Sequence, residues 1–244
     1  MATQLRHRPT TRLPNLHALD WASIEDSLLT SGYAHVPRLV PASACRALRN
    51  LYDQNRYFRS RVVMARYQFG QGEYAYFASP LPPLVSHLRT RLYACLSPVA
   101  NDMMARMNRA LRYPATLEAF REDCRRQGQR HPTPLLLRYR TGDFNCLHRD
   151  LYGPTFFPLQ AMIMLNAPGK DFEGGEFVLV ENRPRQQSRV IALHPALGDL
   201  IIFPVHERPV LGKRGYLRAS MRHGVSPLTS GERYVLGIIF HDAQ

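Results

Sequence analysis

The sequence predicts an α+β fold, with helices in the first half of the chain and a β-sandwich of the jelly-roll type in the second. Before about residue 132, apolar residues recur every three or four positions, which is the spacing of amphipathic helices. After that point they form short runs separated by glycine, proline, asparagine and aspartate. Helices followed by closely spaced strands are typical of a sandwich that helices support on one side.

The first half contains several expected helices. Asp20 is a suitable N-cap for a helix over 21–30, and Gly32 ends it. The other helical patterns cover 42–54, 83–111 and 115–127. Pro98 stands inside the longest pattern, and since proline removes a helical hydrogen bond we expect a break there.

The strands expected in the second half are LLLRYR, CLHRDL, LQAMIMLN, GEFVLVE, RVIALH, DLIIFPV, YLRASMRHGV and RYVLGIIFH. Two earlier segments, RVVMARYQF and EYAYFA, also look like strands, joined across Gly70 and Gly72. We therefore expect one domain over 1–244. In this domain 1–131 are mainly helical support and substrate-side elements, and 132–244 are the jelly-roll core.

Length and composition exclude several classes of protein. The 244 residues are 45% apolar and 21% charged, which is ordinary for a globular protein and argues against disorder. No apolar run is long enough for a membrane-spanning helix, and the basic N-terminus lacks the apolar centre of a secretory signal. The four cysteines form no C-x-x-C pair, so we expect free thiols in a reducing cytoplasm rather than a zinc ribbon. An organelle transit peptide is the alternative interpretation of the arginine-rich start.

The formal net charge is +13, and 30 of the 32 basic residues are arginine. Such an excess predicts either a surface that binds nucleic acid or another polyanion, or a basic surface that is merely solvated. The arginines are scattered along the chain without a cluster, and a bias toward arginine is also typical of G+C-rich genomes. The charge by itself therefore does not decide between the two interpretations.

A candidate metal site begins with His148 and Asp150, which stand two residues apart in a stretch that looks like a strand. Alternate residues of a strand share a face, so both side chains are expected to point toward one ion. One imidazole and one carboxylate beside open positions suit Fe(II), provided that a second histidine comes from elsewhere in the chain.

His223 is the expected second histidine. It closes one expected strand and Arg233 opens the next, so the two side chains are expected on neighbouring antiparallel strands. An arginine that faces inward in an apolar strand needs an anion, because a buried charge without a partner is costly. His206 is the alternative ligand, but no arginine opens an apolar strand after it. If His223 is the ligand, the segment HERPVLGKRGYLRA is an insertion, which we expect to be a loop at the rim.

This combination resembles the iron(II)- and 2-oxoglutarate-dependent oxygenases, and in particular their prolyl-hydroxylase-like branch. The order is H-x-D, a distant histidine, and an arginine ten residues later. RYRTGDFNCLHRD is similar to the segment that leads into the metal-binding strand of that branch. DFEGGEF is similar to its glycine-turn strand, and GDLIIFP is similar to the strand before its second histidine. The match covers about 134–242. It is most similar to a bacterial family labelled as nucleic-acid oxygenases that demethylate damaged DNA.

The resemblance implies a double-stranded β-helix, or cupin-like jelly roll, as the catalytic core. It implies that Fe(II) is held by His148, Asp150 and His223. It also implies that Arg233 binds the distal carboxylate of 2-oxoglutarate and that O₂ completes the site. Tyr139 matches a tyrosine of the family that hydrogen-bonds this co-substrate. Such an enzyme is a dioxygenase of the hydroxylase type, which oxidises a C–H bond and releases succinate and CO₂.

The motifs do not identify the substrate. Candidate residues on the substrate side are Asn145, Tyr74, Tyr76 and Tyr152. Asn145 stands where many relatives carry an aromatic residue. The stretch at about 70–80, which is rich in glycine and tyrosine, is expected to be either a lid over the site or an ordinary hairpin.

Three functions from different classes therefore remain. The first, which we favour because the arginines are dispersed, is an oxygenase that hydroxylates or demethylates a small molecule or an amino-acid-like group. The second is an oxidative demethylase of damaged nucleic acid, which the charge and the family label favour. Against it, the arginine stands closer to the metal histidine than in the well-studied DNA demethylases. The third is a non-catalytic jelly-roll binding protein, against which the intact ligand set argues.

Overall fold

The computed structural model describes residues 13–244, and most of the basic N-terminal stretch lies outside these residues. The α-helices of this range are α1 (Trp21–Thr30), α2 (Ala42–Arg49), α3 (Pro83–Arg106) and α4 (Leu117–Arg126). Within 13–244, no helix combines the length and the apolar character needed to cross a membrane. All four cysteines are free thiols, as expected.

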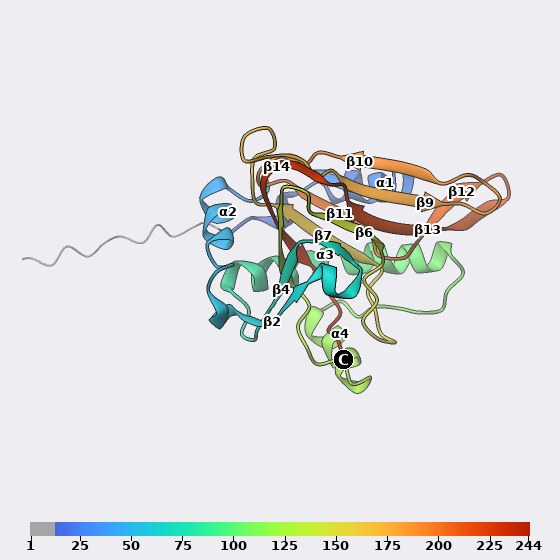
Figure 1. Ribbon diagram of the computed structural model, residues 1–244. Coiled ribbons are helices and arrows are strands. Elements are labelled where there is room, and N and C mark those ends of the chain that lie inside the picture. The colour runs from blue at the N-terminus through green and yellow to red at the C-terminus, as the bar shows by residue number, and fades with distance from the viewer. Residues whose placement is uncertain (1–12) are drawn as a thin grey trace, which may run out of the picture.

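Fourteen strands are defined in the described part of the chain. They are β1 (Ala34–Val36), β2 (Phe58–Val63), β3 (Gly70–Gln71), β4 (Glu73–Phe77), β5 (Leu135–Arg140), β6 (Phe144–His148), β7 (Leu159–Met164), β8 (Phe172–Gly174), β9 (Phe177–Asn182), β10 (Arg189–Leu193), β11 (Leu200–Pro204), β12 (Glu207–Gly212), β13 (Gly215–Val225) and β14 (Leu228–Ile238). The larger sheet has the order β1-β11-β7-β14-β5-β4-β2, and β8 pairs with β14. The smaller sheet has the order β10-β9-β13-β6-β3, and β12 pairs with β13. The two sheets form a sandwich with α3 and α4 beside it (Figure 1), which confirms the predicted α+β jelly-roll fold.

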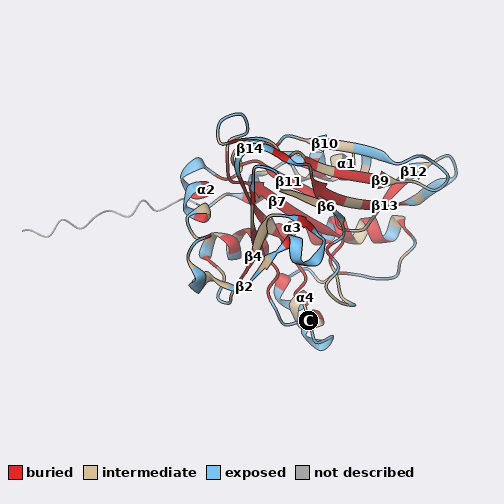
Figure 2. Cartoon of the chain, viewed as in Figure 1, coloured by how far each residue is buried: buried red, intermediate tan, exposed pale blue. Residues whose placement is uncertain are grey.

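The central strands β7 and β11 of the larger sheet and the second half of β14 are buried on both faces (Figure 2). Leu236 and Ile238 of β14 belong to the core that the helices complete, whereas Val235 belongs to a second core between the sheets. Because successive side chains of a strand point to opposite faces, a strand buried on both sides is apolar at every position. This explains why LQAMIMLN and VLGII are nearly continuous apolar runs.

Helix α3 runs through Pro98 without a break, so the expected interruption is wrong. Proline cannot donate to the carbonyl four residues earlier, which here is that of Ala94. The hydroxyl of Ser97 lies 3.4 Å from this carbonyl oxygen and donates to it. The side chain therefore replaces the missing backbone donor, and the buried face of the helix keeps its packing.

Two strand expectations also need correction. The segment HERPVLGKRGYLRA is not a rim loop, because β12 and the first half of β13 pair in it as a long hairpin. RVVMARYQF is not one strand either, since β2 ends at Val63 and a 3-10 turn covers Met64–Tyr67. The pairing of β2 with β4 is as expected. Strands β1 to β4 precede residue 132, so the first half contributes strands to both sheets as well as helices.

Candidate active site

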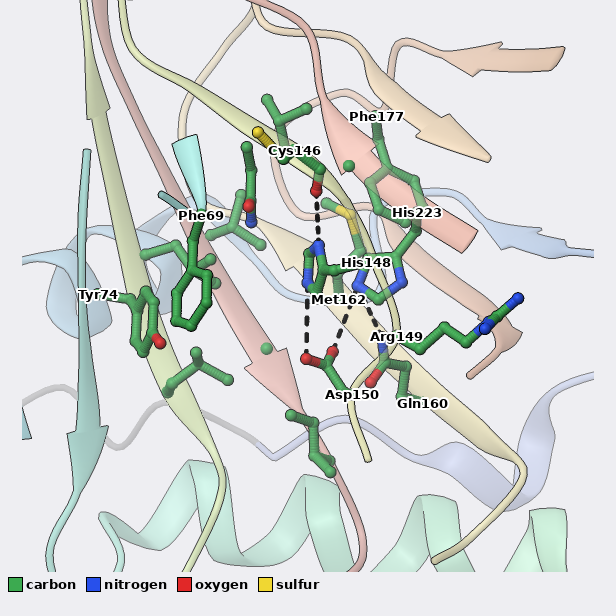
Figure 3. A pocket seen from close by; sticks show the side chains of 18 of the residues that line it. Phe69, Tyr74, Cys146, His148, Arg149, Asp150, Gln160, Met162, Phe177 and His223 are labelled. Atoms are coloured by element: carbon green, nitrogen blue, oxygen red, sulfur yellow. Dashed lines mark hydrogen bonds and ion pairs between the residues drawn. The ribbon is translucent and has the colours of Figure 1, made fainter. Parts of the chain in front are cut away.

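The two sheets enclose a cavity of about 340 Å³ (Figure 3). Alternate residues of β14, among them Arg233 and Val235, line it from the larger sheet. In Figure 3, Phe69 and Tyr74 lie on one side of the cavity and His223 lies on the other. Most lining side chains are apolar and a few polar groups converge, which is typical of a pocket for a small ligand.

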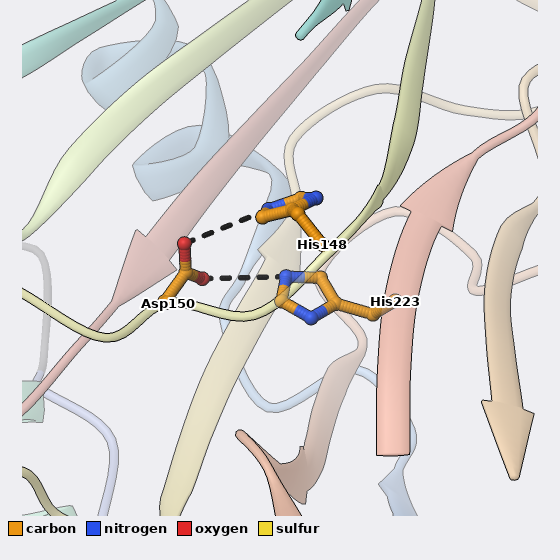
Figure 4. Close-up of side chains that lie close together, drawn as sticks. All are labelled: His148, Asp150 and His223. Carbon is orange, nitrogen blue, oxygen red and sulfur yellow. Dashed lines mark ion pairs between the residues drawn. The ribbon is translucent and has the colours of Figure 1, made fainter. Parts of the chain in front are cut away.

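Two histidines and one aspartate converge on one side of this cavity (Figure 4). The ligand atoms of His148, Asp150 and His223 all lie within 4.8 Å of one another. The Asp150 carboxylate bridges the rings, with Oδ1 3.5 Å from Nε2 of His148 and Oδ2 3.3 Å from Nε2 of His223. His206, the alternative ligand, is not part of this group. The structure therefore brings together the three residues that the sequence singled out.

Strand pairing positions the two histidines. The antiparallel register of β6 and β13 places His148 directly opposite His223, and their ring centroids are 4.2 Å apart. Asp150 is not positioned by strand pairing, because β6 ends at His148. The expectation that His148 and Asp150 share a strand face is therefore wrong. Asp150 lies in the following loop and turns its carboxylate back toward the rings.

The protonation of these groups suits a metal ion. Nδ1 of His148 lies 2.8 Å from the carbonyl oxygen of Cys146 and donates to it, which leaves the lone pair on Nε2. Burial lowers the pKa of His223, which favours its neutral imidazole. Burial alone would raise the pKa of Asp150, but the hydrogen bonds and charge of the two imidazoles hold it well below its usual range. Two imidazoles and one carboxylate form the donor set that suits non-haem Fe(II).

Arg233 on β14 is a candidate anchor for an anion in the same cavity. Its side chain is 1% exposed, and within the described chain its Nε and Nη2 atoms have no hydrogen-bond partner. Burial lowers its pKa to about 10, so the guanidinium stays charged at neutral pH. Because a buried cation with free donors is costly, an anion is expected to bind there. A carboxylate fits, since it accepts two parallel hydrogen bonds from a guanidinium.

His223 and Arg233 do not lie on paired strands, which corrects the expectation from their spacing. β13 belongs to the smaller sheet and β14 to the larger one, and the turn through Pro227 carries the chain from one sheet to the other. Both residues line the same cavity, each from its own sheet. Arg233 pairs instead with Tyr139 of β5, whose ring centroid lies 5.4 Å from the guanidinium carbon.

Tyr139 is fully buried beside Arg233 and lines the cavity. Nδ2 of Asn145 donates to the Tyr139 hydroxyl oxygen at 3.3 Å, so the phenol proton remains available for another acceptor. Burial raises the pKa of Tyr139 to about 12, which keeps this proton in place at neutral pH. Arg233 and Tyr139 thus offer hydrogen-bond donors to the same part of the cavity.

The other predicted residues have different positions. Asn145, Tyr74 and Tyr152 line the cavity. Tyr76 does not line it, and its hydroxyl donates to that of Tyr152 at 3.1 Å. Tyr152 in turn donates to Oδ1 of Asp150 at 2.6 Å, so it contacts a proposed ligand. The stretch at 70–80 is not a free lid, because β4 pairs with both β2 and β5.

Sequence reasoning missed Gln160, which is buried in β7 and lines the cavity. Its Nε2 lies 3.1 Å from Nε2 of His223. The available signal was a single amide in the apolar strand LQAMIM. The aromatic residues Phe69, Phe177 and Phe203 also line the cavity, and they were missed because an apolar residue in a strand is more often core.

Solved structures share this architecture. A prolyl-4-hydroxylase from Pseudomonas putida is similar over 92% of this chain and 100% of its own, with a TM-score of 0.53 and 16% identity. An oxidoreductase of the 2OG-Fe(II) oxygenase family from Burkholderia pseudomallei is similar over 93% of this chain and 94% of its own, with a TM-score of 0.55 and 16% identity. The fold is thus that of the 2-oxoglutarate- and Fe(II)-dependent oxygenases.

Sequence comparison identifies the family. The family Oxygenase-NA, described as "Oxygenase, catalysing oxidative methylation of damaged DNA", matches residues 72–243, and the chain belongs to it. Two proteins of Mycobacterium tuberculosis strains, the uncharacterized proteins MT2286 and Rv2227, are each 44% identical over 167 residues, which are 68% of this chain and 72% of theirs. The resemblance inferred from the motifs is confirmed, and the chain is an oxygenase. The expected Fe(II), 2-oxoglutarate and O₂ agree with the family, the fold and the donor set.

Proposed function

We propose that residues 1–244 act as one oxygenase domain that uses Fe(II), 2-oxoglutarate and O₂ to hydroxylate or demethylate a substrate. The observation that carries this proposal is the presence of two different anchors in one cavity. A set of metal donors, His148, Asp150 and His223, lies on one side. The charged Arg233, with free donors, lines the same cavity from the other sheet. A binding protein without catalysis has no need of both.

The residues of the chain bind and orient the reactants. His148, Asp150 and His223 hold the metal, which when bound supplies the positions for the keto acid and O₂ and the power to oxidise a C–H bond. Arg233 neutralises the distal carboxylate of 2-oxoglutarate, and Tyr139 is placed beside it as a further donor. The apolar wall excludes water, so the oxidation is directed to the bound substrate.

The test of this function combines a metal titration with a product assay. The purified protein is expected to bind a single Fe(II) under anaerobic conditions and to form succinate from 2-oxoglutarate slowly in air, even without added substrate. Chelation should abolish succinate formation, and Fe(II) should restore it whereas Zn(II), which does not change its oxidation state, should not. Iron binding without any succinate would contradict the proposal.

The charges of the cavity favour a substrate whose reactive part is uncharged. Apart from the histidines, the charged residues that line it are Arg149, Asp150 and Arg233. Asp150 and Arg233 are assigned to the metal and the co-substrate. Arg149 is engaged on β13, where it donates to the carbonyl oxygen of Met221 and the hydroxyl of Ser220. Among the described lining residues, none is then left to pair with a substrate ion. A small molecule, or the uncharged side chain of an amino-acid-like substrate, fits this cavity.

Nucleic acid is the second candidate substrate, and one feature at the mouth of the cavity favours it. The side chains of Tyr67 and Phe69 are 59% and 49% exposed, and their rings stack with centroids 5.5 Å apart at 21°. Phe69 also lines the cavity. Exposed aromatic rings are platforms on which the bases of single strands stack, and the charge of +13 suits a phosphate backbone. The description of the family, which mentions damaged DNA, supports the same candidate.

Replacing Tyr67 with alanine tests this candidate. If a base stacks on Tyr67, the variant should bind a short single-stranded oligodeoxynucleotide about five- to 150-fold more weakly, which corresponds to one lost stack. Fluorescence anisotropy at constant salt measures the affinity. Tyr216→Ala is the matched control, because Tyr216 is an exposed tyrosine on the hairpin of β12 and β13 and does not line the cavity. If the two variants bind the oligonucleotide equally well, the nucleic-acid candidate loses this support.

A further inference from the structure

We propose that Gln129 is a positioning residue that fixes the loop carrying Asp150 and thereby orders the metal site before a metal binds. This inference rests on the proposed role of Asp150 as a ligand. Two of the three ligands, His148 and His223, lie on paired strands and are fixed by the sheet. Asp150 lies in the loop 149–158 between β6 and β7, which has no regular secondary structure. Its position therefore depends on what holds the loop.

Gln129 follows α4 and is fully buried. Its side-chain amide pairs with the backbone of Thr155 as a neighbouring strand would. Nε2 donates to the Thr155 carbonyl oxygen at 2.8 Å, and Oε1 accepts from the Thr155 N–H at 2.8 Å. Nε2 also donates to the carbonyl oxygen of Asp242 at 2.6 Å. Both N–H groups of the amide are thus used, and they tie the loop to the C-terminal segment.

The C-terminal end of this connection is itself firmly held. The Asp242 side chain is fully buried and forms ion pairs with Arg89 at 2.7 Å and with Arg121 at 2.8 Å. Arg89, on α3, also donates to the carbonyl oxygens of Ile239 and Phe240. Gln129 therefore connects the loop to an ionic network, centred on the buried Asp242, that spans two helices and the segment after β14.

The loop 149–158 packs closely against the side-chain amide of Gln129. Gly153 has a φ of 150°, and a Cβ atom at this position would lie 2.6 Å from Cδ of Gln129, so only glycine fits. Further along, the N–H of Phe157 donates to Nδ1 of the buried His241 at 3.3 Å. The contacts at Gly153, Thr155 and Phe157 leave little freedom to the start of the loop, where Asp150 lies.

When the hydrogen bonds of the Gln129 side chain are removed, we expect the metal affinity to fall. Partners that orient a metal ligand from outside the coordination sphere typically contribute ten- to a hundredfold in affinity. Gln129→Leu keeps the approximate volume and removes all three hydrogen bonds. We expect it to bind Co(II) about ten- to a hundredfold more weakly than the wild type, in the absence of 2-oxoglutarate and substrate. The visible absorption of bound Co(II) should also change, because the carboxylate is no longer held in one orientation.

Asn166→Leu provides the matched control. Asn166 is also a buried amide, and its Oδ1 accepts from the Tyr234 N–H at 2.8 Å, but it lies between β7 and β8 and makes no contact with the loop through that bond. Both variants lose a buried amide and are expected to lose stability. Co(II) affinity is compared at a temperature at which circular dichroism shows both to be folded. A loss confined to Gln129→Leu supports positioning, and equal affinities in the two variants overturn it.

Hydrogen exchange of the wild-type protein gives a second measurement that needs no variant. The Thr155 amide is expected to exchange slowly, as the amides of the core strands do, because its acceptor is fully buried. Exchange at the rate of an exposed loop would overturn the proposal even if Gln129→Leu does not fold. A wild-type protein that binds no Co(II) contradicts the proposed metal site instead, and the two failures are thereby distinguished.

Discussion

His223→Ala is expected to abolish Fe(II) binding and the turnover of 2-oxoglutarate, whereas His206→Ala is expected to change neither. The Nε2 atom of His223 lies 3.3 Å from the Asp150 carboxylate, so its removal takes away one of three converging donors. The two donors that remain, from His148 and Asp150, must compete with water, so they hold Fe(II) only weakly. Anaerobic equilibrium dialysis measures the bound iron, and circular dichroism checks that the fold persists.

His206 is the appropriate control because it was the alternative ligand and stands just before β12. Burial lowers the pKa of His206 also, so both variants remove an imidazole that is mostly neutral at pH 7. Full iron binding by His223→Ala together with its loss in His206→Ala would show that the ligand assignment is wrong.

Arg233→Leu is expected to weaken 2-oxoglutarate binding while iron binding is retained. The loss of a charge-assisted pair from a desolvated site corresponds to roughly 2–5 kcal/mol, which is about thirty- to several-thousand-fold in affinity. The metal-free variant is expected to unfold at the same temperature as the wild type or a higher one, because a buried cation with unpartnered donors has been removed. Calorimetric titration and a thermal scan measure the two effects.

Arg233→Lys separates charge from geometry. Lysine keeps the positive charge but cannot form two parallel hydrogen bonds to a carboxylate, so we expect an affinity between those of the wild type and Arg233→Leu. An apparent affinity for 2-oxoglutarate that is unchanged in Arg233→Leu contradicts the assignment of this anchor.

Local patterns in the sequence were sufficient for much of this site. Helix α1 begins after Asp20 as predicted, because the Asp20 side chain accepts from the Ser23 N–H at 3.1 Å. His148 and His223 were found because a residue type that can bind a metal is visible directly in the sequence of a strand. Arg233 was found because a charge in an apolar strand is unusual and requires an explanation.

Features that depend on distant parts of the chain were not predictable in this way. Asp150 lies beyond the end of its strand, and β13 and β14 belong to different sheets, although neighbouring strands often pair. The contacts of Gln129 with Thr155 and Asp242 span 26 and 113 residues. Local periodicity does not reveal a side chain whose partners are so far away in the chain. In the sequence, a buried glutamine also cannot be told from one on the surface.

In the proposed function, the crossing of the chain from one sheet to the other between β13 and β14 limits the length of co-substrate that fits. Facing sheets pack about 10 Å apart, and His223 and Arg233 line the cavity from opposite sheets. A dicarboxylate that reaches from a metal on His223 to Arg233, as proposed, would have to match the separation of the two sheets at this point. Phe177 of β9 and Phe203 of β11 meet across the gap with ring centroids 4.7 Å apart and help to keep it constant. With these assignments, discrimination between oxo-acids that differ by one carbon is expected to arise from the rigidity of this packed interior.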